Sequence, residues 1–265
     1  MRHWRALPGI NLVAIMRGMA EWMLTMVLPT FNERDNIRPL IEGILGMARC
    51  PTQVLVVDDD SADGTWQVVA EMAEADPRVH LLRRTDVRGL TSAIAAGIAR
   101  ADTVLVGWMD CDLSMPPERV ADLVDAVARG ADIAIGSRYV PGGRDEGHSW
   151  MGRAFSRAIN LFAALLLGWQ VRDYTSGFVV ARKNVFDRIS LRGDYGEYCI
   201  DLLARAQWMG YRIAEVPYIC QERRSGKSKT ATSFWGYLRR GRKYVAMVLR
   251  LWRERNHEGT KGREG

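Results

Sequence analysis

The chain has 265 residues, 48% of them hydrophobic and 26% charged, which suits one large α/β domain with an appendage. Its four cysteines form no CxxC pair, which argues against a disulfide framework and indicates a reduced, cytosolic setting. The net charge of +6 is uneven: residues 221–265 carry 13 Lys and Arg against 4 Asp and Glu, and residues 1–220 carry 24 against 27. A basic block beside an acidic remainder favours anionic lipid headgroups as a partner over nucleic acid.

The first 22 residues combine early positive charge with an apolar run at 10–16. This run is too short and too interrupted for a secretory signal peptide, so we expect a leader that is disordered or amphipathic. The longest uncharged apolar stretch, at 158–170, falls short of the roughly 20 residues that a membrane-spanning helix needs. We therefore expect no transmembrane helix.

From residue 23 onward, the hydrophobic pattern alternates between strands and helices. Nearly continuous Val, Ile and Leu in the strands is typical of a parallel sheet covered by helices on both faces. We therefore predict an α/β fold with a Rossmann-like, mostly parallel sheet. The expected strands are 24–31, 53–58, 79–83, 103–109 and 132–139, and the expected helices are 35–47, 64–75, 90–100 and 117–129.

Polar residues gather where these strands end, which is where open α/β sheets bind ligands. Phe31 follows the first strand and could stack on a base, although packing in the core is equally open for a single aromatic residue. No GxGxxG motif follows a strand, and the GKS at 226–228 lacks the upstream glycine of a phosphate loop. These absences argue against dinucleotide-binding and P-loop sites.

The most informative stretch is 104–118, in which a buried strand ends in Asp110 and Asp112. On extended backbone these two carboxylates point the same way, and Cys111 points the opposite way. Two carboxylates on one side can share Mg²⁺ or Mn²⁺, which is usually held together with substrate phosphates. Taken alone, the pair could also be a solvated turn or a cap for the next helix.

Two later segments have amphipathic patterns. The segment 148–169 aligns Met151, Phe155, Ile159, Phe162, Leu166 and Trp169, and the segment 234–252 aligns Phe234, Leu238, Val245, Leu249 and Trp252 beside basic residues. Such helices suit an interface with anionic lipid, and they could equally cover the sheet or a neighbouring subunit.

Seven motifs in order resemble glycosyltransferase family 2 enzymes with a GT-A fold, and among them the dolichol- and polyprenyl-phosphate mannosyltransferases. The match spans residues 28–229, about three quarters of the chain. The motifs are PTFNE at 29–33, VDDDSADGT at 57–65, RGL at 88–90, DCDLSMPPE at 110–118, GSRY at 136–139, DYTSGF at 173–178, and VP at 216–217 followed by Arg223, Gly226, Ser228 and Lys229.

The resemblance implies a sugar-nucleotide donor whose diphosphate is held by Mg²⁺ or Mn²⁺. The implied metal ligands are Asp110, Asp112 and Ser114, where the family commonly has Gln in place of Ser114. The family also usually has Tyr where Phe31 stands, which keeps the stacking surface and removes a hydroxyl. The implied donor site consists of Pro29, Phe31, Glu33, Asp58, Asp59, Arg88, Asp110 and Cys111.

The implied acceptor is a polyprenyl or dolichyl phosphate. A phosphate monoester, with a second pKa of about 6, is already largely dianionic at neutral pH and needs arginines rather than a general base. Arg138 is also assigned to the catalytic set with Asp110 and Asp112. The candidate acceptor residues are Arg138, Arg153, Ser156, Arg157, Arg223 and Lys229.

We therefore expect an inverting, metal-dependent hexosyltransferase that moves mannose from GDP-mannose onto a polyprenyl phosphate. It would be peripheral at the cytosolic membrane face, with no nucleic-acid partner, and a membrane-protein partner is left open. One alternative is a UDP-sugar donor or a glycan hydroxyl acceptor, for which Glu197 or Asp201 would be the base. Another is a non-catalytic membrane-binding protein of the same fold.

The expected organisation has three parts. Residues 1–22 form a leader, and residues 23–230 form the GT-A domain, with an interfacial helix at 148–169. Residues 231–265 form a basic amphipathic helix that ends in a disordered tail from residue 253.

Overall fold

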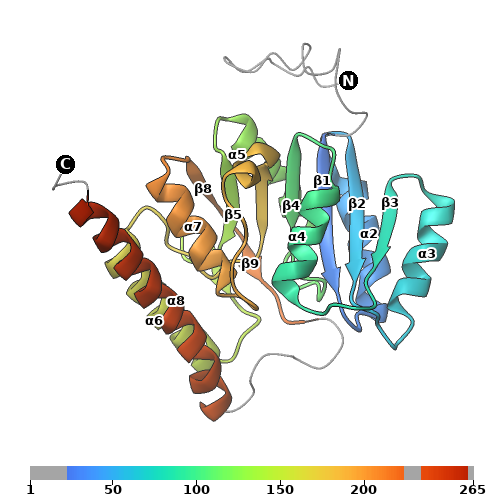
Figure 1. The fold of residues 1–265 in the computed structure, drawn as a ribbon. Coiled ribbons are helices and arrows are strands. Elements are labelled where there is room, and N and C mark those ends of the chain that lie inside the picture. The colour runs from blue at the N-terminus through green and yellow to red at the C-terminus, as the bar shows by residue number, and fades with distance from the viewer. Residues whose placement is uncertain (1–22, 224–233, 262–265) are drawn as a thin grey trace.

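The structure, a computed structural model, describes residues 23–223 and 234–261, and only the backbone for 234–240 and 258–261. Its centre is a seven-stranded sheet in the order β3-β2-β1-β4-β7-β5-β8 (Figure 1). All neighbours pair in parallel except β7, which is antiparallel to β4 and β5. The predicted mostly parallel sheet is therefore confirmed. The strands are β1 (Leu24–Thr30), β2 (Thr52–Asp58), β3 (Val79–Arg83), β4 (Leu105–Trp108), β5 (Ile133–Ser137), β7 (Val179–Arg182) and β8 (Ile213–Pro217).

Helices cover both faces of the sheet, which explains why the strands are apolar on both sides. Alternate residues of β1 show the division: Val27 joins one buried cluster, and Met26 and Leu28 join the other. The first cluster includes residues of α4, α6, α7 and α8, and the second includes residues of α2, α3 and α5. The helices are α2 (Arg34–Met47), α3 (Thr65–Ala75), α4 (Leu90–Arg100), α5 (Val120–Ala128), α6 (Trp150–Leu167), α7 (Tyr198–Trp208) and α8 (Phe234–Lys261), with 3₁₀ turns η1 (Pro117–Arg119) and η2 (Lys183–Asp187).

A second, two-stranded sheet pairs β6 (Arg144–Asp145) in parallel with β9 (Ile219–Cys220). It connects the segment after β5 with the segment after β8. These short strands were not expected from the sequence, because two residues carry no periodicity.

The helices α6 and α8 lie side by side at one end of the sheet (Figure 1). Gly241 permits this approach, because a Cβ there would collide with the ring of Phe155. The helix α8 continues to Lys261. The disordered tail that was expected from residue 253 is therefore wrong for residues 253–261. Arg255 contributes to this extension by donating to the carbonyl of Leu167 at 3.3 Å and lying 5.7 Å from the ring of Trp208.

The amphipathic pattern of α6 divides differently from the predicted stripe. Ile159 is buried, and Phe155, Phe162 and Leu166 pack against the core, so most of that stripe covers the protein itself. Within the described residues, no helix is both long and apolar enough to cross a membrane.

Substituting Gly97 of α4 tests how closely this helix approaches the sheet. A Cβ at Gly97 would overlap the methyl groups of Val27 in β1, so we expect Gly97→Ala to reduce the free energy of unfolding by about 1–3 kcal/mol. A Cβ at Gly46 of α2 would meet no atom within 4 Å, so Gly46→Ala should be neutral or should raise the free energy of unfolding by up to about 1 kcal/mol. Urea unfolding of both variants measures the difference, and equal stabilities would contradict the packing of α4 on β1.

Candidate active site

A cavity of about 680 Å³ opens at the carboxyl ends of the strands, within the size range usual for small-molecule sites. The loops after β1, β2, β4 and β5 line it, together with residues of α6 and α8. The structure thus brings most of the predicted site residues together. Those that line the cavity are Pro29, Phe31, Glu33, Asp59, Arg88, Asp110, Cys111, Asp112, Ser114, Arg138, Ser156 and Arg223.

The aspartate pair follows β4 in a turn rather than on extended backbone, and Leu113 has a positive φ of 63°. Both Asp110 and Asp112 nevertheless line the cavity. Cys111 has a buried side chain, and its thiol donates to the carbonyl of Pro29 at 3.4 Å. The turn closes where Asp112 Oδ1 accepts the backbone N–H of Ser114 at 3.0 Å.

Negative charge accumulates on this side of the cavity. Burial and then the neighbouring charge of Asp112 raise the pKa of Asp110 to about 7, although Arg223 opposes the shift. The Arg223 guanidinium bridges two carboxylates, with Nη2 2.9 Å from Asp112 Oδ2 and Nη1 3.3 Å from Glu33 Oε1. The deprotonated pair therefore gains from any further cation in the cavity.

The end of β2 supplies a second polar wall. Asp59 is buried, and its carboxylate accepts from Arg84 Nε at 2.7 Å and from the Gly89 backbone N–H at 2.8 Å. Phe31 is half-buried at the cavity wall and outside both core clusters, and the exposed Arg88 lies 5.0 Å from its ring centroid. A flat aromatic surface thus stands beside a carboxylate that is already oriented.

The opposite side is organised around Arg138, which follows β5. Its Nε and Nη2 each donate to the buried carboxylate of Asp173 at 2.8 Å, and Nη2 also donates to Thr175 Oγ1 at 2.9 Å. Nη1 lies 3.4 Å from Asp145 Oδ2. Burial lowers the pKa of the guanidinium, but the charge of Asp173 outweighs burial and the pKa is raised well above its ordinary value.

Hydroxyl groups extend this network into the cavity. Tyr139 donates to Ser156 Oγ at 2.8 Å, and Ser156 Oγ lies 3.4 Å from Thr175 Oγ1. Asn160 of α6 also donates to Thr175 Oγ1, at 2.9 Å. The predicted residue Ser156 is therefore connected to Arg138 through Thr175.

Several predicted residues lie elsewhere. Asp58 does not line the cavity, because its oxygens accept from Ser61 and Thr30 inside the fold. Arg153 is turned toward the backbone of Asp145, and Arg157 is exposed on the outer side of α6. These placements argue against direct ligand contacts by the three residues. Lys229 lies outside the described residues.

The two carboxylates considered as a general base also lie outside the cavity. Asp201 is buried beside Arg205, whose Nη1 is 3.1 Å from its Oδ2. Glu197 accepts the backbone N–H of Asp194 at 3.1 Å at the start of α7. Neither is placed to deprotonate a ligand in this cavity.

Three residues of the site received no role from the sequence. Arg84 orients Asp59, Asp173 holds Arg138, and Tyr244 of α8 lines the cavity across from Gly196. Asp173 belongs to a matched motif and could have been found there. The sequence carries no signal for Arg84 or Tyr244, because their roles depend on contacts between distant segments.

Comparison with known proteins gives one family throughout. The model of "Glycosyl transferase family 2" matches residues 25–190. The chain is 43% identical to the polyprenol monophosphomannose synthase of Mycolicibacterium smegmatis, over 78% of this chain and 81% of the relative. It is 37% identical to the undecaprenyl-phosphate mannosyltransferase of Micrococcus luteus, over 90% and 98%. It is 33% identical to the dolichol-phosphate mannosyltransferase of Pyrococcus furiosus, over 82% and 62%.

Solved structures with the same fold include glucosyl-3-phosphoglycerate synthase of Mycobacterium tuberculosis. Its complex with Mn²⁺, UDP-glucose and glycerol 3-phosphate superposes with a TM-score of 0.66 at 20% identity, covering 94% of this chain and 86% of that one. Its complex with Mn²⁺, UDP and glucosyl-3-phosphoglycerate gives 0.65 at 21% identity, with the same coverage. This likeness confirms the predicted GT-A fold.

The buried ion pair between Arg138 and Asp173 at the cavity wall is open to test by substitution. Asp173→Asn leaves the Arg138 charge buried without its main partner, so we expect the free energy of unfolding to fall by about 3–5 kcal/mol. Glu71 forms an exposed ion pair with Arg38, so Glu71→Gln should change stability by less than about 0.5 kcal/mol. Denaturant unfolding measures both, and a small effect of Asp173→Asn would show that the pair does not hold the cavity together.

Proposed function

The chain belongs to glycosyl transferase family 2 and is a glycosyltransferase, and from this premise we propose that it transfers mannose from GDP-mannose to a polyprenyl phosphate at the cytosolic face of a membrane. One observation carries the proposal: a single cavity is lined both by Asp110 and Asp112, which suit a metal diphosphate, and by Arg138 and Ser156, which suit a phosphate acceptor. The names of three relatives, all polyprenyl- or dolichol-phosphate mannose enzymes, support the choice of sugar and acceptor.

The nucleoside of the donor is proposed to bind beside β1 and β2. Phe31 would stack on the base, and Asp59 and Glu33 would accept hydrogen bonds from its N–H groups or from the ribose. Arg84 orients Asp59 before any donor arrives, because its guanidinium donates to that carboxylate. Arg88 stands over Phe31 and would add positive charge near the phosphates.

The diphosphate is proposed to bind at the aspartate pair with a divalent cation. The residues fit such an ion, because two carboxylates line the cavity. Burial, followed in size by repulsion from Asp112, raises the pKa of Asp110, and a bound cation would relieve both effects. Bound Mg²⁺ or Mn²⁺ would neutralise charge on the leaving diphosphate. Ser114 is the proposed third oxygen ligand, and Arg223 adds a second positive charge from its position between Glu33 and Asp112.

The acceptor phosphate is proposed to bind on the Arg138 side. Arg138 has five N–H donors, and four of them have partners among the described residues, which leaves one on Nη1 for a ligand. Its charge is already matched by Asp173 and Asp145, so it would orient the phosphate more than attract it. The hydroxyl of Ser156 would supply a further hydrogen bond.

This arrangement favours a single displacement with inversion. The acceptor oxygen would attack the sugar from the Arg138 side while the diphosphate leaves toward Asp110 and Asp112. A phosphate dianion needs no general base, which agrees with the positions of Glu197 and Asp201 outside the cavity. The same positions count against the alternative of a hydroxyl acceptor that uses either carboxylate as a base.

Membrane contact is proposed for the outer side of α6 and α8. Trp150, Leu161 and Leu165 of α6 and the adjacent Trp169 are each more than half exposed. The neighbouring α8 adds exposed Trp252 and a set of exposed basic residues. Apolar and basic side chains on adjacent helices suit the interface of an anionic bilayer. The exposed basic residues of α8 are Arg242, Lys243, Arg250, Arg253 and Arg255.

Transfer to a lipid phosphate is the direct test. Purified protein with Mn²⁺, labelled GDP-mannose and a short polyprenyl phosphate should form lipid-linked mannose, with UDP-glucose as the competing donor. Asp110→Asn and Asp112→Asn should each lower the rate by about 100-fold or more, because each removes a carboxylate that would hold the divalent cation on the diphosphate. Asp86→Asn is the control, since Asp86 is an exposed carboxylate in the loop after β3 and does not line the cavity. No lipid product with either donor would overturn the proposal.

Vesicle binding tests the membrane surface separately. Leu161→Glu with Leu165→Glu should weaken sedimentation with anionic vesicles by at least about tenfold, because two apolar side chains lose their burial in lipid. Met47→Glu is the control, since Met47 is equally exposed at the end of α2. Equal binding of the double variant and the parent would remove α6 from the proposed membrane surface.

A further inference from the structure

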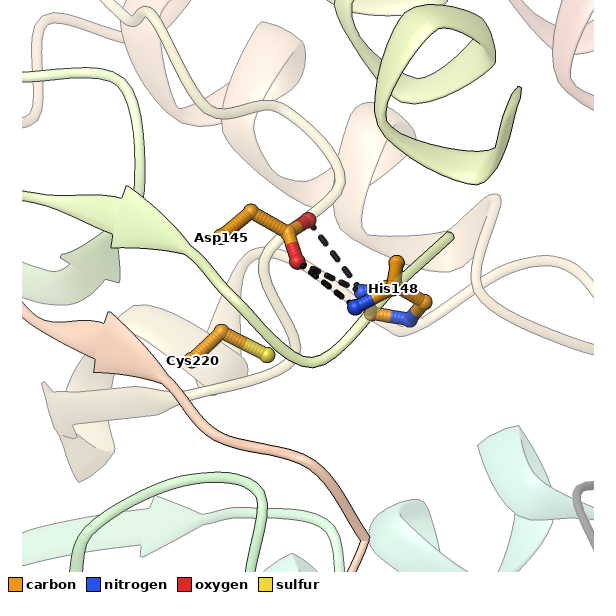
Figure 2. Close-up of side chains that lie close together, drawn as sticks. All are labelled: Asp145, His148 and Cys220. Carbon is orange, nitrogen blue, oxygen red and sulfur yellow. Dashed lines mark hydrogen bonds and ion pairs between the residues drawn. The ribbon is translucent and has the colours of Figure 1, made fainter. Parts of the chain in front are cut away.

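Three side chains with different ligand atoms converge at the cavity, and none of them belongs to the aspartate pair. Figure 2 shows Asp145 of β6, His148 of the following turn and Cys220 of β9 lying close together. One oxygen, one nitrogen and the sulfur lie within 4.8 Å of one another. The proposed transfer reaction uses neither His148 nor Cys220.

The backbone holds these residues in place. The Arg144 N–H donates to the carbonyl of Tyr218 at 3.0 Å, and the Glu146 N–H donates to the carbonyl of Cys220 at 2.9 Å. Asp145 and Cys220 are therefore partners in a parallel pair of strands. The turn is closed by Asp145 Oδ1, which accepts the backbone N–H of His148 at 3.2 Å.

Gly147 permits the close approach of the turn to β9. A Cβ at this position would collide with the backbone carbonyl of Gln221 and would lie 3.3 Å from Cys220 Sγ. Any side chain at residue 147 would thus push His148 away from Cys220. The convergence of the three ligand atoms depends on this glycine.

The ligand types suit a transition metal rather than Mg²⁺. Thiolate and imidazole select Zn²⁺ and related ions, whereas Mg²⁺ prefers an all-oxygen set such as Asp110 and Asp112. A divalent ion with one carboxylate, one thiolate and a neutral imidazole gives a net charge of zero. The Nη1 atom of Arg138 lies 3.4 Å from Asp145 Oδ2, and the charge of this guanidinium is also paired with Asp173, so Asp145 is not its main partner.

The distances are close to those that a metal requires. Zinc bonds of about 2.0–2.3 Å place tetrahedral ligand atoms roughly 3.3–3.8 Å apart, so the most widely separated of the three atoms would need to approach by up to about 1 Å. His148 Nδ1 lies 2.9 Å from Asp145 Oδ1, so these two atoms would instead separate slightly. The His148 side chain is 39% exposed and can adjust, whereas Cys220 and the Asp145 side chain are buried.

A proton and a metal would compete for this cluster. Hydrogen bonds that His148 donates to Asp145 and Cys220 raise its pKa to about 10, although burial opposes the shift. A metal would therefore displace a proton from His148 as well as one from the thiol. His148 and Cys220 also line the cavity, so a fourth ligand would come from water or from a molecule bound there.

We propose that Asp145, His148 and Cys220 form a binding site for Zn²⁺ or a similar transition-metal ion, independent of the Mg²⁺ or Mn²⁺ site at Asp110 and Asp112. The ion would fasten β9 to the turn that leads into α6. The fourth coordination position would face the cavity.

Cobalt titration of the full, reduced chain tests this site. Co²⁺ should bind at one equivalent with the near-ultraviolet charge-transfer band of a cobalt–thiolate bond, and Zn²⁺ should remove the band while excess Mg²⁺ should not. Cys220→Ser should abolish the band. His148→Gln and Asp145→Asn should each weaken binding by at least about tenfold, and Gly147→Ala should do the same by displacing the turn.

Cys50→Ser is the matched control, because Cys50 is a free thiol remote from the cluster in the chain and absent from it. It should keep the band and the cobalt affinity of the parent. Zn²⁺ should also raise the melting temperature of the parent and of Cys50→Ser but not of Cys220→Ser. A parent without a thiolate band at tenfold excess Co²⁺, or a Cys220→Ser variant that keeps the band, would overturn the proposal and leave only an Asp145–His148 ion pair beside a buried thiol.

Discussion

The buried ion pair between Arg138 and Asp173 is the interaction on which the cavity depends. It joins the end of β5 to the segment before β7, the one antiparallel strand of the seven-stranded sheet. Two charges taken out of water are tolerated only when they are paired and well hydrogen-bonded, so the pair restricts both segments to one arrangement. Through Thr175 that arrangement also places Ser156 of α6. The acceptor side of the cavity is thus built from segments that share a single charge constraint.

The other side of the cavity has the opposite balance. Asp110, Asp112 and Glu33 all line the cavity, and Arg223 bridges Asp112 and Glu33. Burial and the charge of Asp112 make the ionised form of Asp110 costly and raise its pKa. A fold that keeps carboxylates in this position remains poised for a cation. Arg138 is paired with carboxylates, whereas the acidic residues around Asp110 would gain from a further cation. This difference suits a reaction in which a metal diphosphate leaves near the acidic residues and a phosphate binds near Arg138.

The helices α6 and α8 serve the cavity on one side and solvent on the other. Tyr244 of α8 and Phe155 of α6 line the cavity, whereas Leu161, Leu165 and Trp252 face outward. The apolar residues of these helices therefore fall into two groups. One group packs against the protein core, and the other is exposed at the proposed membrane interface. The turn that holds His148 follows Asp145 and leads directly into α6, so a metal bound between this turn and Cys220 of β9 would act on the same helix.

The order of strands and helices up to residue 139, the mostly parallel sheet and the cluster of polar residues at its carboxyl edge could be predicted from the sequence, because hydrophobic period and strand ends are local properties. The strands β7 and β8 and the helix α7 were not predicted. The motifs also assigned Phe31, Asp59 and the aspartate pair to one site, and the structure brings them to one cavity. Arg223, which the motifs assigned to the acceptor phosphate, lies instead between Glu33 and Asp112. Only the tertiary structure decided that Asp58 and Arg157 point away, that Arg84 holds Asp59, and that α8 continues to Lys261. These outcomes depend on contacts between segments distant in the chain, such as the hydrogen bond from Arg255 to the carbonyl of Leu167, which no local pattern records.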